Sequence, residues 1–297
     1  MSFTNPDETF FATLIQETAE LDAARLLIES KRAFGGKLAY SPFTVYSTID
    51  TGNSLANYPE IRVENIETPE LLRYCLFGSK VHACSLAEEA AREIKRTFIW
   101  IDPICLLLRP PFELLLQPPI KAAFRPVHIA NIGQPADAPL NDYWKIIYRH
   151  TGNRISTFSL TSFVDNKTIL PYFNTHCFSL DPAMEICSTW VRALKETIID
   201  EELAQHLTST PNRIFLFQAV LSGVILSKLT EDEIHILRAD YSYPYHLQKD
   251  IPNEKKALRL EDLTCLVYED KSPHPDDITD LQVGESLSAW LRAHIKK

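Results

Sequence analysis

The sequence feature that most constrains the fold is the run Thr97–Ile101, in which every residue is β-branched or aromatic. Such residues favour extended chain, and a run that is apolar on both faces is typical of a strand in a covered parallel sheet. Pro103 keeps the preceding residue, Asp102, extended. Because ligands of open α/β sheets bind beyond the carboxyl ends of the strands, Asp102 is a candidate for holding a metal ion or a hydroxyl group. The alternative is a turn or helix-cap residue.

The first third of the chain alternates between strand and helix patterns. Apolar, extended segments at residues 10–15, 43–47 and 61–66 predict strands, and the periodic apolar positions of residues 21–34 predict a helix that ends at Gly35. A second helix is expected to begin at Ser85, because Glu88 completes a capping-box pattern. This alternation predicts an α/β fold with a mostly parallel central sheet flanked by helices, in which residues 97–101 form an interior strand.

The rest of the chain continues the pattern without an internal repeat or a long linker. Strands are expected at residues 122–127, 172–180, 234–237 and 263–268, and helices at residues 112–116, 141–150, 182–198, 214–229 and 287–295. We therefore expect a single domain over residues 1–297.

Composition excludes some classes of protein. The 30 basic and 39 acidic residues give a net charge of −9, which argues against a general nucleic-acid binder. The six cysteines contain no C-x-x-C pair and lie mostly in apolar stretches, so we expect free, buried thiols. Residues 1–8 lack the apolar region of a signal peptide, and the longest apolar run, residues 214–226, is too short to span a bilayer. A cytoplasmic protein without a transmembrane segment is expected; the oligomeric state stays open.

Four short blocks of the sequence resemble blocks of the nucleotide-diphospho-sugar transferase superfamily, the GT-A type of glycosyltransferase, and they occur in the same order along the chain. Residues 98–102 (FIWID) are similar to the strand that delivers the family's Asp-x-Asp metal motif, and residues 172–178 (YFNTHCF) to a block on the acceptor side of the sugar site. Residues 217–221 (FQAVL) are similar to the family's "DQxxL" helix, and residues 236–243 to the segment that follows it.

The resemblance implies the GT-A fold, with residues 1–102 as the nucleotide-binding half and residues 103–297 as the acceptor-side half. It also implies a glycosyltransferase that moves a sugar from a nucleotide-sugar donor to an acceptor. The alternative is a non-catalytic protein of the same fold that binds a nucleotide or a glycan, because fold alone does not fix function.

Several positions depart from the family pattern. The second Asp of the metal motif is replaced by Ile104, the Asp before the Gln by Phe217, and the Gly of the acceptor-side block by His176. Residues 265–268 contain no metal-binding His. The family's Mn²⁺ or Mg²⁺ would therefore meet only one hard protein ligand, Asp102, with the remaining oxygens coming from the substrate phosphates and water. The sequence predicts weak metal binding at most.

Three residues are candidates for catalysis. Asp102 follows the buried strand. His176 titrates near neutral pH and is two residues from Asn174, so both side chains are expected on one face of the strand at residues 172–180. Asp165 is a candidate inverting base, or else a turn residue.

The substrate-binding candidates each have a structural alternative. Arg125, His128 and Asn131 carry donors for phosphate, and the alternative for Arg125 and His128 is a surface ion pair. Asn174 and Gln218 suit sugar hydroxyls or backbone groups. The remaining two candidates are Tyr243 and Tyr245, which suit stacking on a base or sugar ring, or packing on the core.

Overall fold

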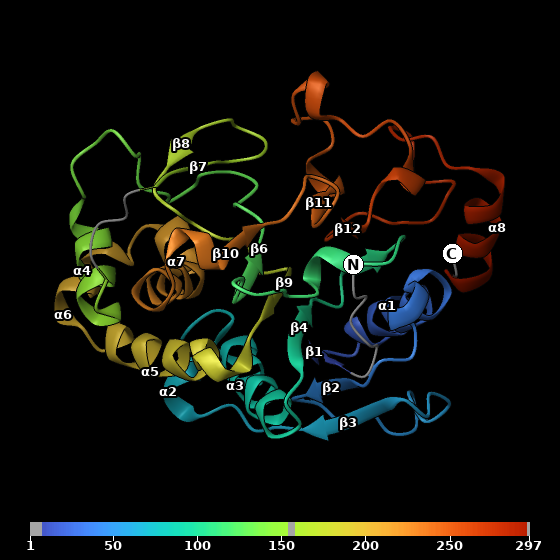
Figure 1. Ribbon diagram of the computed structural model, residues 1–297, viewed down its shortest axis with the longest axis horizontal. Coiled ribbons are helices and arrows are strands. Elements are labelled where there is room, and N and C mark those ends of the chain that lie inside the picture. Colours follow the sequence, from blue (N-terminus) through green and yellow to red (C-terminus); the bar gives the residue numbers. More distant parts are fainter. Residues whose placement is uncertain (1–7, 154–157, 296–297) are drawn as a thin grey trace.

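The computed structural model describes residues 8–153 and 158–295. The prediction about a signal peptide concerns mainly residues 1–7 and therefore lies outside the described residues. A seven-stranded sheet with the strand order β10-β6-β9-β4-β1-β2-β3 runs through the molecule (Figure 1). Its strands are β1 (Thr9–Ile15), β2 (Phe43–Ser47), β3 (Ile61–Asn65), β4 (Thr97–Ile101), β6 (Ala122–Phe124), β9 (Cys177–Leu180) and β10 (Ile234–Ile236). Strands from both sides of residue 102 therefore belong to one sheet.

The central sheet is mostly parallel, as predicted. Neighbouring pairs among β3, β2, β1 and β4 are parallel, as are β6 and β10. Only β9 runs antiparallel to its neighbours β4 and β6. Strand β4 matches the predicted bounds and lies between β1 and β9, which confirms the predicted interior position.

Helices cover both faces of this sheet (Figure 1). The helices of the described residues are α1 (Glu20–Phe34), α2 (Glu70–Arg73), α3 (Gly78–Glu93), α4 (Asp142–Thr151), α5 (Ile186–Ile198), α6 (Glu201–His206), α7 (Thr210–Lys228) and α8 (Glu285–His294). Two small sheets complete the described chain: β5 (Cys105–Leu107) with β11 (Tyr243–Pro244) and β12 (Cys265–Val267), and the hairpin of β7 (Leu160–Thr161) and β8 (Thr168–Ile169). The segment expected as a helix at residues 112–116 is a 3₁₀ turn, Phe112–Leu114.

The alternation of side chains along β4 separates two cores. Phe98 and Trp100 face the core that contains α3, α4, α5 and α7. Ile99 and Ile101 face the opposite core, which contains α1 and the sheet of β5 and β12. Because both faces are covered, the strand is apolar throughout, and the first polar side chain after it, Asp102, comes where the chain leaves the sheet.

Several predicted boundaries are wrong, and two of them have an identifiable cause. Helix α3 begins at Gly78 rather than Ser85, and Glu88 caps another helix: its carboxylate accepts hydrogen bonds from the backbone N–H groups of Cys187 (2.9 Å) and Ser188 (3.0 Å) at the start of α5. A capping-box spacing inside a helix is indistinguishable from one at its start when only the sequence is read.

Strand β9 begins at Cys177, so residues 172–176 are not part of it. The Asn174 side-chain oxygen accepts a hydrogen bond from the His176 backbone N–H (2.8 Å), so this N–H bonds locally and not to a neighbouring strand. The Phe173 N–H likewise donates to the Ser222 hydroxyl of α7 (3.0 Å). Asn174 and His176 therefore do not share a strand face, although they stay close to each other.

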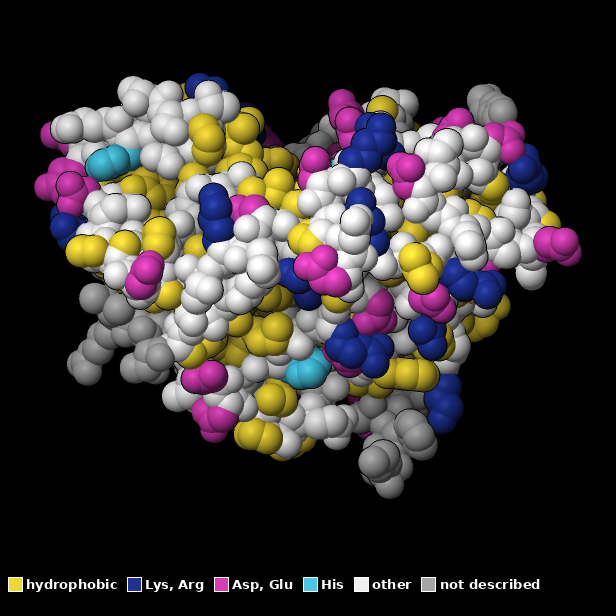
Figure 2. Space-filling view, turned by 90° about the horizontal axis from the view of Figure 1, so that it is seen from above, with side chains coloured by type: hydrophobic (Ala, Val, Ile, Leu, Met, Phe, Trp, Pro, Cys, Tyr) yellow, Lys and Arg dark blue, Asp and Glu magenta, His cyan; other side chains and the backbone are white. Residues whose placement is uncertain are grey.

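The expectation of free, mostly buried thiols agrees with the described residues. All six cysteines are free, and five of them are buried. No helix in residues 8–153 and 158–295 is both long and apolar enough to cross a bilayer. On the face drawn in Figure 2, basic and acidic side chains are interspersed and form no continuous basic area.

Candidate functional site

A cavity of about 630 Å³ lies beyond the carboxyl ends of β1 and β4. Its lining comes from the end of β1, the starts of α1 and α3, and the end of β4 with residues 102–104. The rest comes from residues 127–129 and 131, residues 174–176, the first turns of α7, and residues 246, 247 and 269. Cavities of roughly 300–1,000 Å³ are typical of sites for small ligands. The position is the one where open α/β sheets bind their ligands.

The antiparallel direction of β9 brings two distant polar segments together at the cavity floor. Ile101 pairs with Cys177, so the end of β4 lies beside the start of β9. The backbone N–H of Asp102 donates to the carbonyl of His176 (2.8 Å), which extends this pairing by one residue. A parallel neighbour would have placed residues 174–176 at the opposite edge of the sheet.

Lys80, on α3, reaches the same point. Its ammonium group donates to Asp102 Oδ2 (2.6 Å), to the Thr175 carbonyl (2.9 Å) and to the Thr175 hydroxyl (3.2 Å). The other carboxylate oxygen of Asp102 accepts from the Trp100 indole N–H (2.7 Å). Lys80 and Asp102 are only 5% and 8% exposed, so this ion pair is a buried one.

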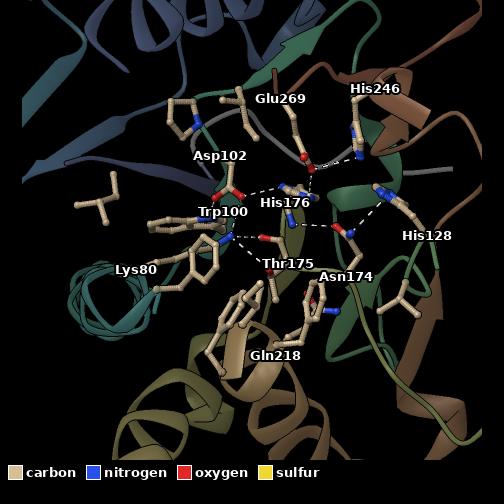
Figure 3. A pocket seen from close by; sticks show the side chains of 18 of the residues that line it. Lys80, Trp100, Asp102, His128, Asn174, Thr175, His176, Gln218, His246 and Glu269 are labelled. Atoms are coloured by element: carbon tan, nitrogen blue, oxygen red, sulfur yellow. Dashed lines mark hydrogen bonds and ion pairs between the residues drawn. The ribbon is translucent and has the colours of Figure 1, made fainter. Parts of the chain in front are cut away.

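The contacts continue from Asp102 through two histidines. His176 Nδ1 lies 3.0 Å from Asp102 Oδ2, and His176 Nε2 lies 3.4 Å from the Glu269 carboxylate. His246 Nε2 lies 3.4 Å from the same Glu269 oxygen. Lys80, Asp102, His176, Glu269 and His246 thus form a connected series across the cavity floor, which we call the polar chain (Figure 3).

The polar chain has a defined charge pattern. Burial raises the pKa of Asp102, but Lys80 and His176 more than offset this and hold the pKa below its ordinary range. Burial lowers the pKa of His176, but hydrogen bonds to Asp102 and Glu269 raise it to about 9. Burial lowers the pKa of His246 below its ordinary value. At neutral pH, His176 is therefore a cation between two carboxylates, and His246 is neutral.

We expect the stabilisation provided by charged His176 to disappear as the pH rises from 6.5 to about 9. Because the folded-state pKa is raised above the unfolded value, the contribution is fully present below pH 6.5 and is lost as the pH passes through 9. A shift of this size corresponds to on the order of 3 kcal/mol.

The measurement is the difference in free energy of unfolding between wild type and His176→Gln across this pH range. Buried Lys31, whose pKa burial lowers to about 7, titrates in both proteins and cancels in the difference. A difference that does not change with pH would contradict the assigned charge of His176.

Six of the sequence-predicted residues line the cavity. They are Asp102, His128, Asn131, Asn174, His176 and Gln218. The His128 imidazole lies nearly parallel to that of His176, with ring centroids 5.8 Å apart, and its Nε2 lies 2.8 Å from the Ser242 carbonyl. Burial, followed by the positive charge of His176, lowers the pKa of His128 well below its ordinary value, so this ring is a neutral donor.

Arg125 and Asp165 are not among the residues that line the cavity. Arg125 is buried rather than at the surface, and its guanidinium donates to the Leu237 carbonyl (3.3 Å). The Asp165 carboxylate accepts from the Ala130 backbone N–H (3.1 Å) and from the Ser162 hydroxyl (2.5 Å) within a turn. The structure thus places Asp165 in its alternative role, as a turn residue.

The two candidate tyrosines also lie outside the cavity lining. Tyr243 is 1% exposed, and its hydroxyl donates to Gln248 Oε1 (2.6 Å). Tyr245 packs in the same hydrophobic cluster, around β11 and β12. Both therefore take the core-packing alternative.

Sequence reasoning missed Lys80 and Glu269. The sequence does indicate that Lys80 is buried, because it continues the apolar helical face of Cys84, Ala87 and Ala91 on α3. A lysine on such a face needs a buried partner. Glu269 carries no such signal: it lies in a turn after β12 at φ 45°, and only tertiary packing brings it to His176.

The polar chain does not fit the metal of the family. Both carboxylate oxygens of Asp102 already accept hydrogen bonds, and its closest partner is an ammonium group, which repels a divalent cation. The next cavity residues, Pro103 and Ile104, offer only hydrocarbon side chains. Within residues 8–153 and 158–295, no group of three or more His, Cys, Asp or Glu side chains is arranged to hold a metal ion.

Comparisons with known proteins agree with this fold. No protein-family model and no curated protein sequence matches the chain. Among solved structures, the galactosyltransferase LgtC in complex with donor and acceptor sugar analogues matches with a TM-score of 0.57 at 10% identity, over 97% of this chain and 96% of that one. An active-site mutant of LgtC gives a TM-score of 0.55 at 9% identity, over the same shares of the two chains. The mouse xyloside xylosyltransferase 1 gives 0.47 at 11% identity, over 87% and 97%. The chain has the fold of the GT-A type glycosyltransferases.

Proposed function

We propose that the protein is a glycosyltransferase that moves a sugar from a nucleotide-sugar donor, bound in the cavity, to an acceptor. The observation that carries this proposal is the polar chain, which lies at the ligand-binding edge of a GT-A fold inside a cavity of about 630 Å³. LgtC, the protein with the same fold, was solved with donor and acceptor sugar analogues, which supports the assignment of substrate class.

In this proposal, cations of the protein neutralise the diphosphate that leaves the sugar. Lys80 and His176 are the positively charged candidates, and Asp102 holds both in place. The 3.4 Å contact between His176 Nε2 and Glu269 is long for a hydrogen bond, so a phosphate oxygen can replace Glu269 as the partner of this N–H while Asp102 holds the ring. Donors fixed before the reaction stabilise developing charge without reorganisation.

The alternative is a non-catalytic protein that binds a nucleotide or a glycan in the same cavity. One observation favours it: every carboxylate oxygen of Asp102 is already used by the protein, so this Asp is not available to a substrate unless the ion pair rearranges. Phe217 also replaces the acidic residue expected before Gln218 by the family resemblance.

A thermal-shift panel tests the proposal. Saturating UDP, GDP, CDP, ADP or TDP is expected to raise the melting temperature for at least one base, because a ligand at 100 times its dissociation constant stabilises the folded state by about 2.7 kcal/mol. The matching nucleotide-sugar is then assayed for transfer or slow hydrolysis. Binding without turnover would favour the non-catalytic alternative. A melting temperature that no nucleotide raises would contradict nucleotide binding by a glycosyltransferase and by a non-catalytic protein alike.

A further inference from the structure

One side of the cavity is built from hydrophobic side chains, and the function proposed above does not use it. Phe77 precedes α3, while Ile214, Phe215 and Phe217 belong to the first turns of α7. We call these four residues the aromatic wall. None of these four side chains carries a polar atom, so they offer no hydrogen bond to a phosphate or to a sugar hydroxyl.

The aromatic wall has a layered arrangement. The rings of Phe77 and Phe217 lie with centroids 4.6 Å apart and planes 32° apart. Phe217 in turn stacks on Trp190 of α5, with centroids 6.1 Å apart and planes 24° apart. Phe217 is 4% exposed and Phe77 44%, so the series begins in the core and ends at the mouth of the cavity. A flat apolar group can extend such a series at its open end.

Phe77 is held in its position by the backbone around it. Its φ of 66° lies in the left-handed region, which is unfavourable for a bulky side chain. A Cβ on the next residue, Gly78, would lie 1.9 Å from the Leu72 carbonyl oxygen, so only glycine allows α3 to begin at this point. Strained residues of this kind persist where the surrounding structure fixes them, and they are concentrated at ligand sites.

We propose that the aromatic wall binds a flat, apolar group of the acceptor, such as an aryl aglycone, and so presents the acceptor hydroxyl towards the polar chain. That the bound molecule is an acceptor rests on the proposed function, whereas the preference of the cavity for an aryl group does not. A cavity of about 630 Å³ suits a small molecule of this class rather than a folded partner.

Matched glycosides test this preference. The probes are the 4-nitrophenyl and methyl β-glycosides of glucose, galactose and xylose, with affinities measured by calorimetry on the full chain. At least one 4-nitrophenyl glycoside is expected to bind ten-fold or more tightly than its methyl counterpart. Phe77→Ala is expected to reduce this ratio at least five-fold, and Phe215→Ala to reduce it as well. The control is Tyr74→Ala, which removes a 77% exposed ring outside the cavity lining and is expected to leave the ratio unchanged.

Equal affinities within every pair, or no binding of any 4-nitrophenyl glycoside, would overturn the proposal. A ratio that survives in both Phe77→Ala and Phe215→Ala would overturn it too. Failure of the proposed function gives a different result: the nucleotide panel would be negative while the preference for the aryl glycoside remained.

Discussion

Replacing Lys80 with methionine is expected to lower the free energy of unfolding by about 3 kcal/mol at neutral pH, because breaking a buried ion pair leaves a charge without its partner. Lys80 is the nearest cation to Asp102, at 2.6 Å, and both side chains are almost fully buried. His176 stays beside Asp102 at 3.0 Å, so the loss should fall at the low end of the usual range of about 3–5 kcal/mol. Urea denaturation monitored by circular dichroism gives the value.

The matched control is Lys145→Met. Lys145 pairs with Asp142 at 2.8 Å on the exposed surface of α4, where solvent screens an ion pair and its contribution to stability is small. Adding Asp102→Leu to Lys80→Met should lower the stability further, since it also removes the partner of charged His176. If Lys80→Met cost no more than Lys145→Met, the buried ion pair would not be the centre of the site.

The second large effect concerns metal binding. Wild type is expected to bind Mn²⁺ very weakly, and Ile104→Asp alone to improve binding only modestly, because Lys80 still occupies Asp102. Combining Ile104→Asp with Lys80→Met leaves two carboxylates two residues apart without the competing ammonium. This variant should bind Mn²⁺ at least ten-fold more tightly when a nucleoside diphosphate supplies further oxygens.

Calorimetry with the diphosphate present measures this effect, and Ile104→Asn with Lys80→Met is the control of similar shape without the second carboxylate. Tight Mn²⁺ binding by wild type in the absence of nucleotide would contradict the assignment of Asp102 as the partner of Lys80.

The sequence predicted the fold correctly where the hydrophobic pattern of a segment matches its burial in the tertiary structure. The apolar run of β4 matched its strand because both faces of that strand are buried. The predictions were wrong where a side chain bonds to a distant or unexpected group: Glu88 caps α5, and Asn174 binds the His176 backbone where a strand was expected. Patterns of hydrophobicity do not contain these partners.

The site was predictable in part for the same reason. Asp102 follows from its place after a buried strand, and His176 from its polar side chain near Asn174 in an apolar segment; both line the cavity. The contacts of Lys80 and Glu269 with them span long sequence separations, which neither spacing nor composition reveals. Tyr243 and Tyr245 illustrate the opposite error, since aromatic residues in a loop pack on the core as readily as on a ligand.

The most direct test is a calorimetric titration of the nucleoside diphosphate chosen by the panel into wild-type protein in the presence of EDTA. We predict binding within about three-fold of the affinity measured with Mn²⁺, and at least ten-fold weaker binding to Lys80→Met, because cations of the protein replace the metal. Binding that is absent in EDTA and restored by Mn²⁺ in wild type would contradict this account.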